Sequence, residues 1–209
     1  MLEHIEFLGH ASFKIRGSLL VYTDPYKIEE SETADLILIT HSHFDHCSPE
    51  DVKKISGKNT TIVGSRDCSE ALKGMEGRFV GISPHEKLDV RGVSVEAVPA
   101  YNLDKSFHPK ANGWNGYVLT MDGTRYYHPG DTDRIPEMND LRVDVVFVPV
   151  GGTYTMDFRE AASVVSILNP KIAIPMHYGE VIGSEKDARA FVKLVGDSGR
   201  LIPPKKGSR

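Results

Sequence analysis

The chain has 209 residues, of which 26% are charged and 40% hydrophobic, and its net charge is -4 at pH 7. This length and composition predict a single globular domain over residues 1–209 with a sizeable core. The acidic balance, without a long run of like charge, argues against a general nucleic-acid-binding surface. No apolar run approaches the ~20 residues that cross a bilayer. Because there is no leader-like segment and neither Cys47 nor Cys68 belongs to a disulfide framework, we expect a cytoplasmic protein without membrane contact.

Short strands open the chain and lead to a buried strand. The opening strands are predicted at residues 2–8, 12–16 and 18–23. Residues 36–40 are continuously apolar, which is typical of a strand buried on both faces. Ser48 and Pro49 then predict the cap and first turn of a helix. A strand at residues 60–63 and a short helix at residues 65–72 are expected to follow.

The rest of the chain repeats this order of strands followed by alternating strands and helices. Strands are predicted at residues 79–82, 88–90, 93–98, 116–121, 124–127, 143–150, 172–175 and 201–202. Asp122 and Gly123 are a strong hairpin signal. Asp157 and Glu160 predict the cap of a helix that runs to about residue 168, and residues 184–195 predict a second helix. Two sheets packed face to face with helices outside are the expected architecture.

The strongest functional signal is the sequence HSHFDH at residues 41–46, directly after the buried strand. Imidazole and carboxylate are the ligand types that Zn²⁺ and related divalent ions prefer. His41 and His43 are two residues apart, so in an extended segment they point the same way. Asp45 and His46 follow where the chain turns, so they can face a second ion. A polar loop that is His-rich by chance is improbable, because the whole chain has only 9 histidines.

Further histidine and aspartate side chains follow later strands, where catalytic groups of layered α/β proteins gather. These candidate ligands are His108, Asp131 and His177. Gly130 precedes Asp131 and permits a close approach of the backbone to the metals.

The other histidines and polar loop residues allow functional and structural interpretations. His10 is either a donor at the rim of the site or a structural hydrogen-bonding group, with equal weight. A structural role is expected for His128, and surface positions for His4 and His85. Residues near the predicted ligands are candidates for the pocket wall or substrate contacts, with ordinary packing or a solvated loop as the alternative: Tyr101, Asn102, Lys105, Trp114, Arg134 and residues 153–157.

Residues 41–46, the turn Gly130-Asp131-Thr132 and His177 resemble the metallo-β-lactamase-fold hydrolases. The sequences LGHASF at residues 8–13 and TDP at residues 23–25 resemble the compact branch of ascorbate-phosphate lactonase-like and uncharacterised zinc-dependent hydrolases. The resemblance implies an α+β fold, a four-layer αββα sandwich with a binuclear metal site along one edge. It further implies a first metal bound by His41, His43 and His108, a second bound by Asp45, His46 and His177, and Asp131 bridging both.

The resemblance also implies a metal-dependent hydrolase. A hydroxide that bridges two divalent ions would attack an ester-like bond, namely a lactone, phosphoester, amide or thioester. Asp45 or Asp131 would orient the nucleophile, and the leaving group would be stabilised by a metal or by a donor such as His10. Two dications, two carboxylates and one hydroxide leave a single positive charge, so a small, anionic metabolite is the expected substrate. Zinc is the expected ion, although manganese or iron would fit the same ligands.

Three alternatives remain open at this stage, and exposed sheet edges are compatible with a homo-oligomer. An RNA-processing nuclease of the same fold is disfavoured by the acidic charge and the compact length. A di-iron redox centre is disfavoured because His43 stands where such proteins typically have Glu. A non-enzymatic metal-binding protein is disfavoured because all seven expected ligands are present.

Overall fold

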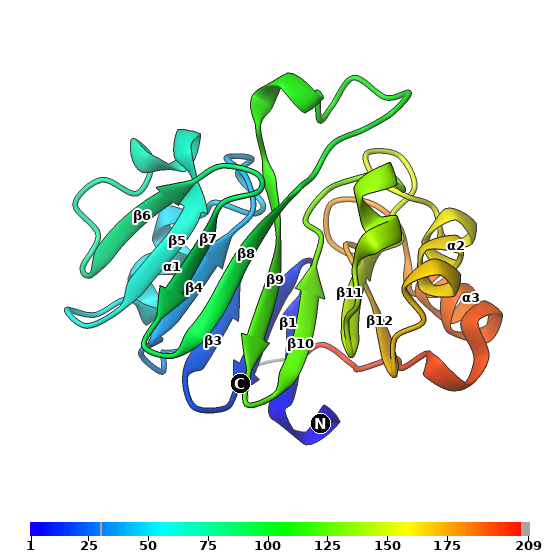
Figure 1. The fold of residues 1–209 in the computed structure, drawn as a ribbon, viewed down its shortest axis with the longest axis horizontal. Coiled ribbons are helices and arrows are strands. Elements are labelled where there is room, and N and C mark those ends of the chain that lie inside the picture. Colours follow the sequence, from blue (N-terminus) through cyan, green and yellow to red (C-terminus); the bar gives the residue numbers. More distant parts are fainter. Residues whose placement is uncertain (30, 206–209) are drawn as a thin grey trace.

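The computed structural model describes residues 1–29 and 31–205, and its strands form two six-stranded sheets (Figure 1). The first sheet has the order β1 (Ile5–Gly9), β2 (Ser12–Arg16), β3 (Leu20–Thr23), β4 (Leu36–Ile39), β5 (Thr61–Ser65) and β6 (Arg78–Ile82). The second sheet has the order β12 (Ile172–Met176), β11 (Val145–Pro149), β10 (Thr124–His128), β9 (Asn115–Met121), β8 (Val93–Pro99) and β7 (Lys87–Val90).

Both sheets begin antiparallel and end parallel along the chain. In the first sheet, β1, β2 and β3 are antiparallel neighbours, and β3 to β6 are parallel. In the second sheet, β7 to β10 are antiparallel, and β10 to β12 are parallel. The repeated order of elements read from the sequence therefore corresponds to two similar halves.

Three α-helices cover the sheets, and each begins at a side-chain cap. They are α1 (Pro49–Ile55), α2 (Phe158–Leu168) and α3 (Glu185–Val195). Figure 1 shows α1 with the first sheet, and α2 and α3 together beside β11 and β12. The Ser48 side chain accepts a hydrogen bond from the Asp51 N–H, as the sequence predicted. Asp157 likewise accepts from two N–H groups in the first turn of α2.

The αββα arrangement is confirmed by two separate apolar cores. The larger core contains Leu36 and Leu38 together with residues of the second sheet. The smaller core, under α1, contains Ile37 and Ile39. Alternate residues of β4 therefore face opposite cores, which explains why this strand is apolar throughout.

Three predicted elements differ from the structure. Residues 2–4 form a 3₁₀ turn closed by the His4 N–H on the Met1 carbonyl, so β1 begins at Ile5. Residues 65–72 do not form an α-helix. Ser65 is the last residue of β5 and pairs with Ile82 of β6, and only a 3₁₀ turn follows it. Residues 201–202 are not a strand; after one bridge at Gly199 the chain reaches Pro203 and Pro204, which lack the N–H that further pairing needs.

The remaining helical elements are short 3₁₀ turns. They lie at Leu2–His4, Arg66–Ser69, Lys110–Asn112, Pro136–Asp140 and Gly196–Ser198. None of the helices in the described part of the chain combines the length and the apolar character needed to cross a bilayer.

Candidate metal centre

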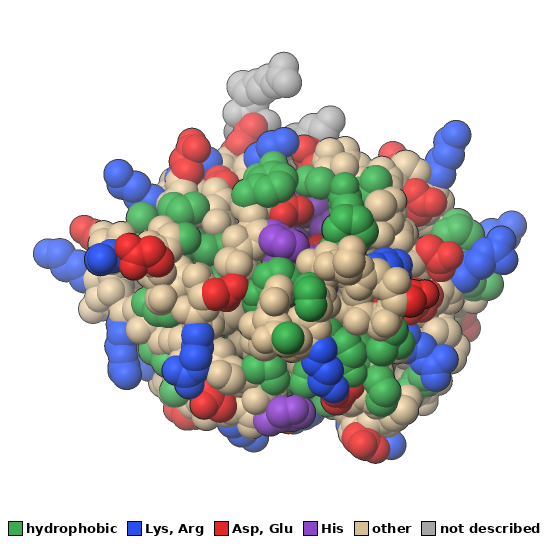
Figure 2. Space-filling view, turned by 90° about the horizontal axis from the view of Figure 1, so that it is seen from above, with side chains coloured by type: hydrophobic (Ala, Val, Ile, Leu, Met, Phe, Trp, Pro, Cys, Tyr) green, Lys and Arg blue, Asp and Glu red, His purple; other side chains and the backbone are tan. Residues whose placement is uncertain are grey.

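The candidate ligands meet at one edge of the sandwich, and both sheets contribute to them. His41, His43, Asp45 and His46 follow β4 of the first sheet, whereas His108, Asp131 and His177 follow β8, β10 and β12 of the second. Figure 2 looks onto this edge and shows histidine and acidic side chains near its centre, with hydrophobic side chains beside them. Side chains separated by more than a hundred residues in sequence are therefore neighbours in space.

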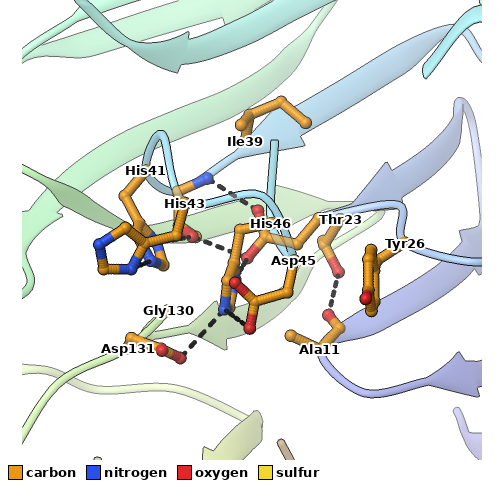
Figure 3. Close-up of polar contacts among 12 residues, drawn as sticks. Ala11, Thr23, Tyr26, Ile39, His41, His43, Asp45, His46, Gly130 and Asp131 are labelled. Atoms are coloured by element: carbon orange, nitrogen blue, oxygen red, sulfur yellow. Dashed lines mark hydrogen bonds and ion pairs between the residues drawn. The ribbon is translucent and has the colours of Figure 1, made fainter. Parts of the chain in front are cut away.

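His41, His43 and His108, called the imidazole trio below, form one group of converging nitrogens. Their ligand atoms lie within 4.8 Å of one another. The Nε2 atom of His41 is 3.1 Å from Nδ1 of His43 (Figure 3). Burial lowers the pKa of His41 well below its ordinary value and also lowers the pKa of half-buried His43. These imidazoles are therefore held neutral, which is the form that binds metal.

Neutral partners orient two members of the imidazole trio. The Thr40 hydroxyl donates to Asp24 at 2.7 Å, so its oxygen accepts from Nδ1 of His41 at 3.0 Å. Nδ1 of His108 is 3.0 Å from the Asn102 side-chain oxygen, to which it donates. Both rings are thereby fixed with Nε2 toward the site, an arrangement common among metal-binding histidines.

Trp114 forms one wall of the imidazole trio. Its ring centroid lies 4.9 Å from that of His41 and 4.8 Å from that of His43. The indole N–H donates to Asp67 at 2.7 Å, and Asp67 also accepts from Ser42. Because Trp114 is buried and anchored, it shields this side of the site from water.

His10, Asp45, His46 and His177, called the mixed cluster below, form a second group within 4.8 Å. The His10 Nε2 atom lies 2.9 Å from Asp45 Oδ2. Burial opposes ionisation of Asp45, but the hydrogen bond from His10 and the charge of His46 outweigh it and lower the pKa to about 2. Asp45 is therefore ionised at neutral pH.

Asp131 lies between the two groups. Its Oδ2 atom is 3.0 Å from Nε2 of His177 and 3.3 Å from Nε2 of His108. Its Oδ1 atom is 3.3 Å from Nε2 of His46, the contact drawn in Figure 3. Although burial raises it, the pKa of Asp131 stays well below its ordinary value because His177 and His46 favour the anion.

Asp24 is a further residue of the candidate site that was not singled out from the sequence, although it lies in the TDP motif at residues 23–25. This fully buried carboxylate accepts from Nδ1 of His46 at 2.8 Å and from the Thr40 N–H at 2.8 Å. Burial lowers the pKa of His46, yet Asp131 and Asp24 outweigh it and raise the pKa well above its ordinary value. The negative field that favours a proton on His46 also favours a metal cation there.

Several buried polar atoms of the site have no hydrogen-bond partner among the described residues. These atoms include Nε2 of His46, His108 and His177, and Oδ1 of Asp131; the contacts of the three nitrogens with Asp131 at 3.0–3.3 Å are not aligned as hydrogen bonds. Buried polar groups in proteins are almost always satisfied, so such a concentration calls for an explanation. Nitrogen and carboxylate donors aimed at one another fit divalent ions such as Zn²⁺, Mn²⁺ or Fe²⁺.

His10 is part of the mixed cluster and does not lie at its rim. It is almost fully buried, and its backbone has a left-handed φ of 52°. Its carbonyl accepts the N–H of His177, which has a φ of 58°, at 2.6 Å. The two loops are thereby joined directly beneath the site.

The structure also separates structural from functional interpretations at other positions. His128 is buried and bonds the Ala11 carbonyl, while His4 and His85 are exposed. Gly130 has a φ of 64°, and a Cβ there would lie 2.8 Å from the Thr40 side chain, so this position requires glycine. Lys105 does not extend freely into the site, because its ammonium lies 2.5 Å from Asp133.

Comparison with known proteins agrees with this geometry. Residues 4–177 match the beta-lactamase superfamily domain. The UPF0173 metal-dependent hydrolase of Pyrococcus abyssi is 34% identical over 97% of this chain and 96% of its own length. The corresponding protein of Thermococcus onnurineus is 36% identical with the same coverage of both chains.

Solved structures of other proteins share the fold of this chain. A Parabacteroides distasonis protein assigned as a metal-dependent hydrolase has a TM-score of 0.83 at 32% identity, covering 95% of this chain and 91% of its own. Igni18, a metallo hydrolase from Ignicoccus hospitalis, shares the fold with a TM-score of 0.78 at 24% identity, covering 97% of this chain and 95% of its own.

Proposed function

Because this chain belongs to the UPF0173 metal-dependent hydrolases of the metallo-β-lactamase superfamily, we propose that it hydrolyses an ester-like bond of a small molecule at a binuclear centre. The bond is a lactone, phosphoester, amide or thioester. The observation that carries the proposal is the convergence of buried histidine nitrogens and two ionised carboxylates, with Nε2 of His46, His108 and His177 and Oδ1 of Asp131 left without hydrogen bonds.

The imidazole trio would hold one ion, and Asp45, His46 and His177 would hold the other. Asp131, which contacts members of both groups, would bind both ions. Bound there, two divalent ions would supply Lewis acidity for a scissile carbonyl or phosphoryl group and lower the pKa of water between them.

The protein's own residues orient the reactants and keep bulk water out. Asp45 and Asp131 are ionised, so either carboxylate can accept a hydrogen bond from the attacking water and orient it. His10 donates to Asp45 from a buried position, so we assign it to positioning that carboxylate rather than to stabilising the leaving group. Trp114 excludes water beside the imidazole trio.

Zinc is our proposed ion, because histidine supplies most of the ligands and the site is mainly buried. A reducing compartment such as the cytoplasm is the proposed location. Cys47 and Cys68 are free thiols buried in the smaller core, consistent with a protein that does not rely on disulfides.

The test combines metal analysis with a substrate panel. Purified protein is assayed for metal content and for hydrolysis of phosphodiester, lactone, thioester and β-lactam substrates, with and without chelator. About two ions per chain and chelator-sensitive turnover of one substrate class are expected. Failure to bind metal under any loading condition would contradict the proposal and favour an interaction module.

A further inference from the structure

Exposed hydrophobic side chains are concentrated beside the candidate metal centre. Among the described residues, four large hydrophobic side chains are exposed: Phe44 (66%), Leu103 (59%), Leu194 (57%) and Phe107 (45%). Phe44 lies between His43 and Asp45 in the ligand loop, and Leu103 and Phe107 lie in the loop that ends at His108. Only Leu194, on α3, belongs to another part of the molecule.

Two tyrosines extend this set into what we call the apolar rim: Tyr26, Phe44, Leu103, Phe107 and Tyr154. The rings of Phe44 and Tyr26 pack edge to face with centroids 5.9 Å apart. Those of Phe107 and Tyr154 pack in the same way at 4.7 Å. The apolar rim therefore draws on four loops, those that follow β3, β4, β8 and β11.

The loop that presents Leu103 and Phe107 is held in place by a buried carboxylate. Asp133 accepts from the Leu103 N–H at 2.9 Å and from the Lys105 ammonium at 2.5 Å. Asn102 donates to Asp133 and to the Tyr154 carbonyl, which ties this loop to the loop after β11. The exposed hydrophobic side chains thus stand on an anchored support, not on a frayed segment.

Cations in the same loops are paired with carboxylates. Lys105 pairs with Asp133, Lys27 with Glu180 at 3.2 Å, and Lys110 with Glu137 at 2.9 Å. These lysines therefore do not offer an uncompensated charge to a polyanionic substrate. With two dications bound, attraction for negative charge would be concentrated at the metal centre, and hydrophobic contact is available around it.

Because a polar metal centre is surrounded by exposed hydrophobic side chains, we propose that the substrate is amphiphilic. Its polar ester-like group is cleaved at the metal centre, and an uncharged alkyl or aryl group lies against the apolar rim. This inference rests on the proposed function and adds the substrate class to it. Exposed apolar groups clustered around a polar centre are typical of binding sites rather than of ordinary surface. Phe44 and Phe107 are the residues assigned to contact the hydrocarbon.

The experiment measures binding without turnover. Zinc-loaded full-length protein is titrated by calorimetry with acetohydroxamate, butyrohydroxamate, hexanohydroxamate and octanohydroxamate, which share one metal-binding head and differ only in alkyl length. Affinity is expected to rise about two- to fourfold per methylene while the chain covers the apolar rim.

Variants identify the contact surface. Phe44→Ala and Phe107→Ala, tested separately, should reduce the gain per methylene while zinc content and acetohydroxamate affinity stay unchanged. The matched control is Leu194→Ala, which removes an equally exposed hydrophobic side chain on α3 and should leave the whole series unchanged. Since Phe44 lies between two candidate ligands, Phe107→Ala keeps the test valid if Phe44→Ala loses zinc.

Each contrary result has a distinct meaning. A flat series, or a gain per methylene that neither variant reduces, would overturn the proposal. Binding of neutral phosphatidylcholine vesicles that both variants abolish, with a flat hydroxamate series, would instead make the apolar rim a membrane contact. If the series behaves as expected but no ester-like substrate is hydrolysed, the proposed function fails and the apolar-rim assignment stands.

Discussion

The imidazole trio and the mixed cluster are adjacent but differ in charge, exposure and support. The imidazole trio has no carboxylate of its own, includes the half-buried His43, and is oriented by the neutral side chains Thr40 and Asn102. The mixed cluster is buried, contains Asp45, and is backed by Asp24. Neutral nitrogen donors select a metal mainly by ligand type and geometry, whereas carboxylates add a general attraction for any dication. On the proposed function, the imidazole trio and the mixed cluster would therefore bind their ions by different means.

Replacing Asp131 should have the largest effect, because among the described residues it is the one carboxylate that contacts histidines of both groups. For Asp131→Asn we expect loss of both ions and a fall in kcat/KM of about a thousandfold or more, as when a central member of a catalytic unit is removed. Metal analysis and the chelator-controlled assay measure the two effects. Full turnover with both metals retained would refute the bridging role.

Single-ligand variants should separate the two groups. His43→Ala is expected to reduce metal content from about two ions per chain to about one, with the mixed cluster still occupied. His177→Ala should also leave about one ion, now held by the imidazole trio. Loading each variant with cobalt and comparing absorption spectra would tell the remaining sites apart. Identical spectra would show that the two groups are not independent.

The orienting residues should give a smaller, graded effect. Asp24→Asn removes the charge behind His46 and is expected to weaken metal binding about 10- to 100-fold. Asn102→Ala removes a neutral acceptor from His108 and should lie near the lower end of that range. Competition with a chromophoric chelator measures both affinities. An equal loss in both variants would mean that the charge of Asp24 adds nothing.

The smallest effect concerns the pH dependence of the metal-free protein. Burial keeps the pKa of His41 well below its ordinary value, whereas Asp131 and Asp24 outweigh burial and raise that of His46. His46 therefore contributes stability that is present below pH ~6.5 and lost as pH rises through its folded-state pKa. His41 contributes stability that is present above pH ~6.5 and lost as pH falls toward its folded-state pKa.

An NMR titration of the histidine rings after chelator treatment checks these opposite directions. His46 should stay protonated at a pH where His41 is already neutral. Coincident titration of the two rings would contradict the contrast in charge between the groups.

Much of the fold was predictable because each strand carries its own pattern. The continuous apolar run of β4 reflects burial against two cores, and Ser48 and Asp157 cap helices where the sequence places them. The error at residues 65–72 occurred where pairing with a distant segment decides the outcome, whereas the errors at residues 2–4 and 201–202 reflect a local turn and two prolines. Ser65 belongs to β5 because it pairs with Ile82, and no local preference reveals that partner.

Like the fold, the candidate site was predictable where the signal is local in sequence and not where it depends on distant segments. The residue types and spacing at 41–46 indicate metal ligands, and the structure brings these side chains together as expected. Asp24 was missed because its role depends on β3 lying parallel to β4, which places its carboxylate beside Thr40 and His46. Lys105 was a candidate substrate contact with a solvated loop as the alternative, and nothing near it in sequence reveals Asp133 as its partner.

Each sheet is built from consecutive strands, so the boundary between the sheets is also a boundary in the sequence, between β6 and β7. Most strand pairing is thereby local along the chain, and either sheet can begin to assemble during folding before the other. Neither sheet alone holds a complete set of candidate ligands. We therefore expect metal binding to be a late step in folding, after the two sheets have packed together. A bound ion would then hold the two halves together. It would stabilise the folded protein by about 4 kcal/mol when the free metal concentration exceeds the dissociation constant a thousandfold.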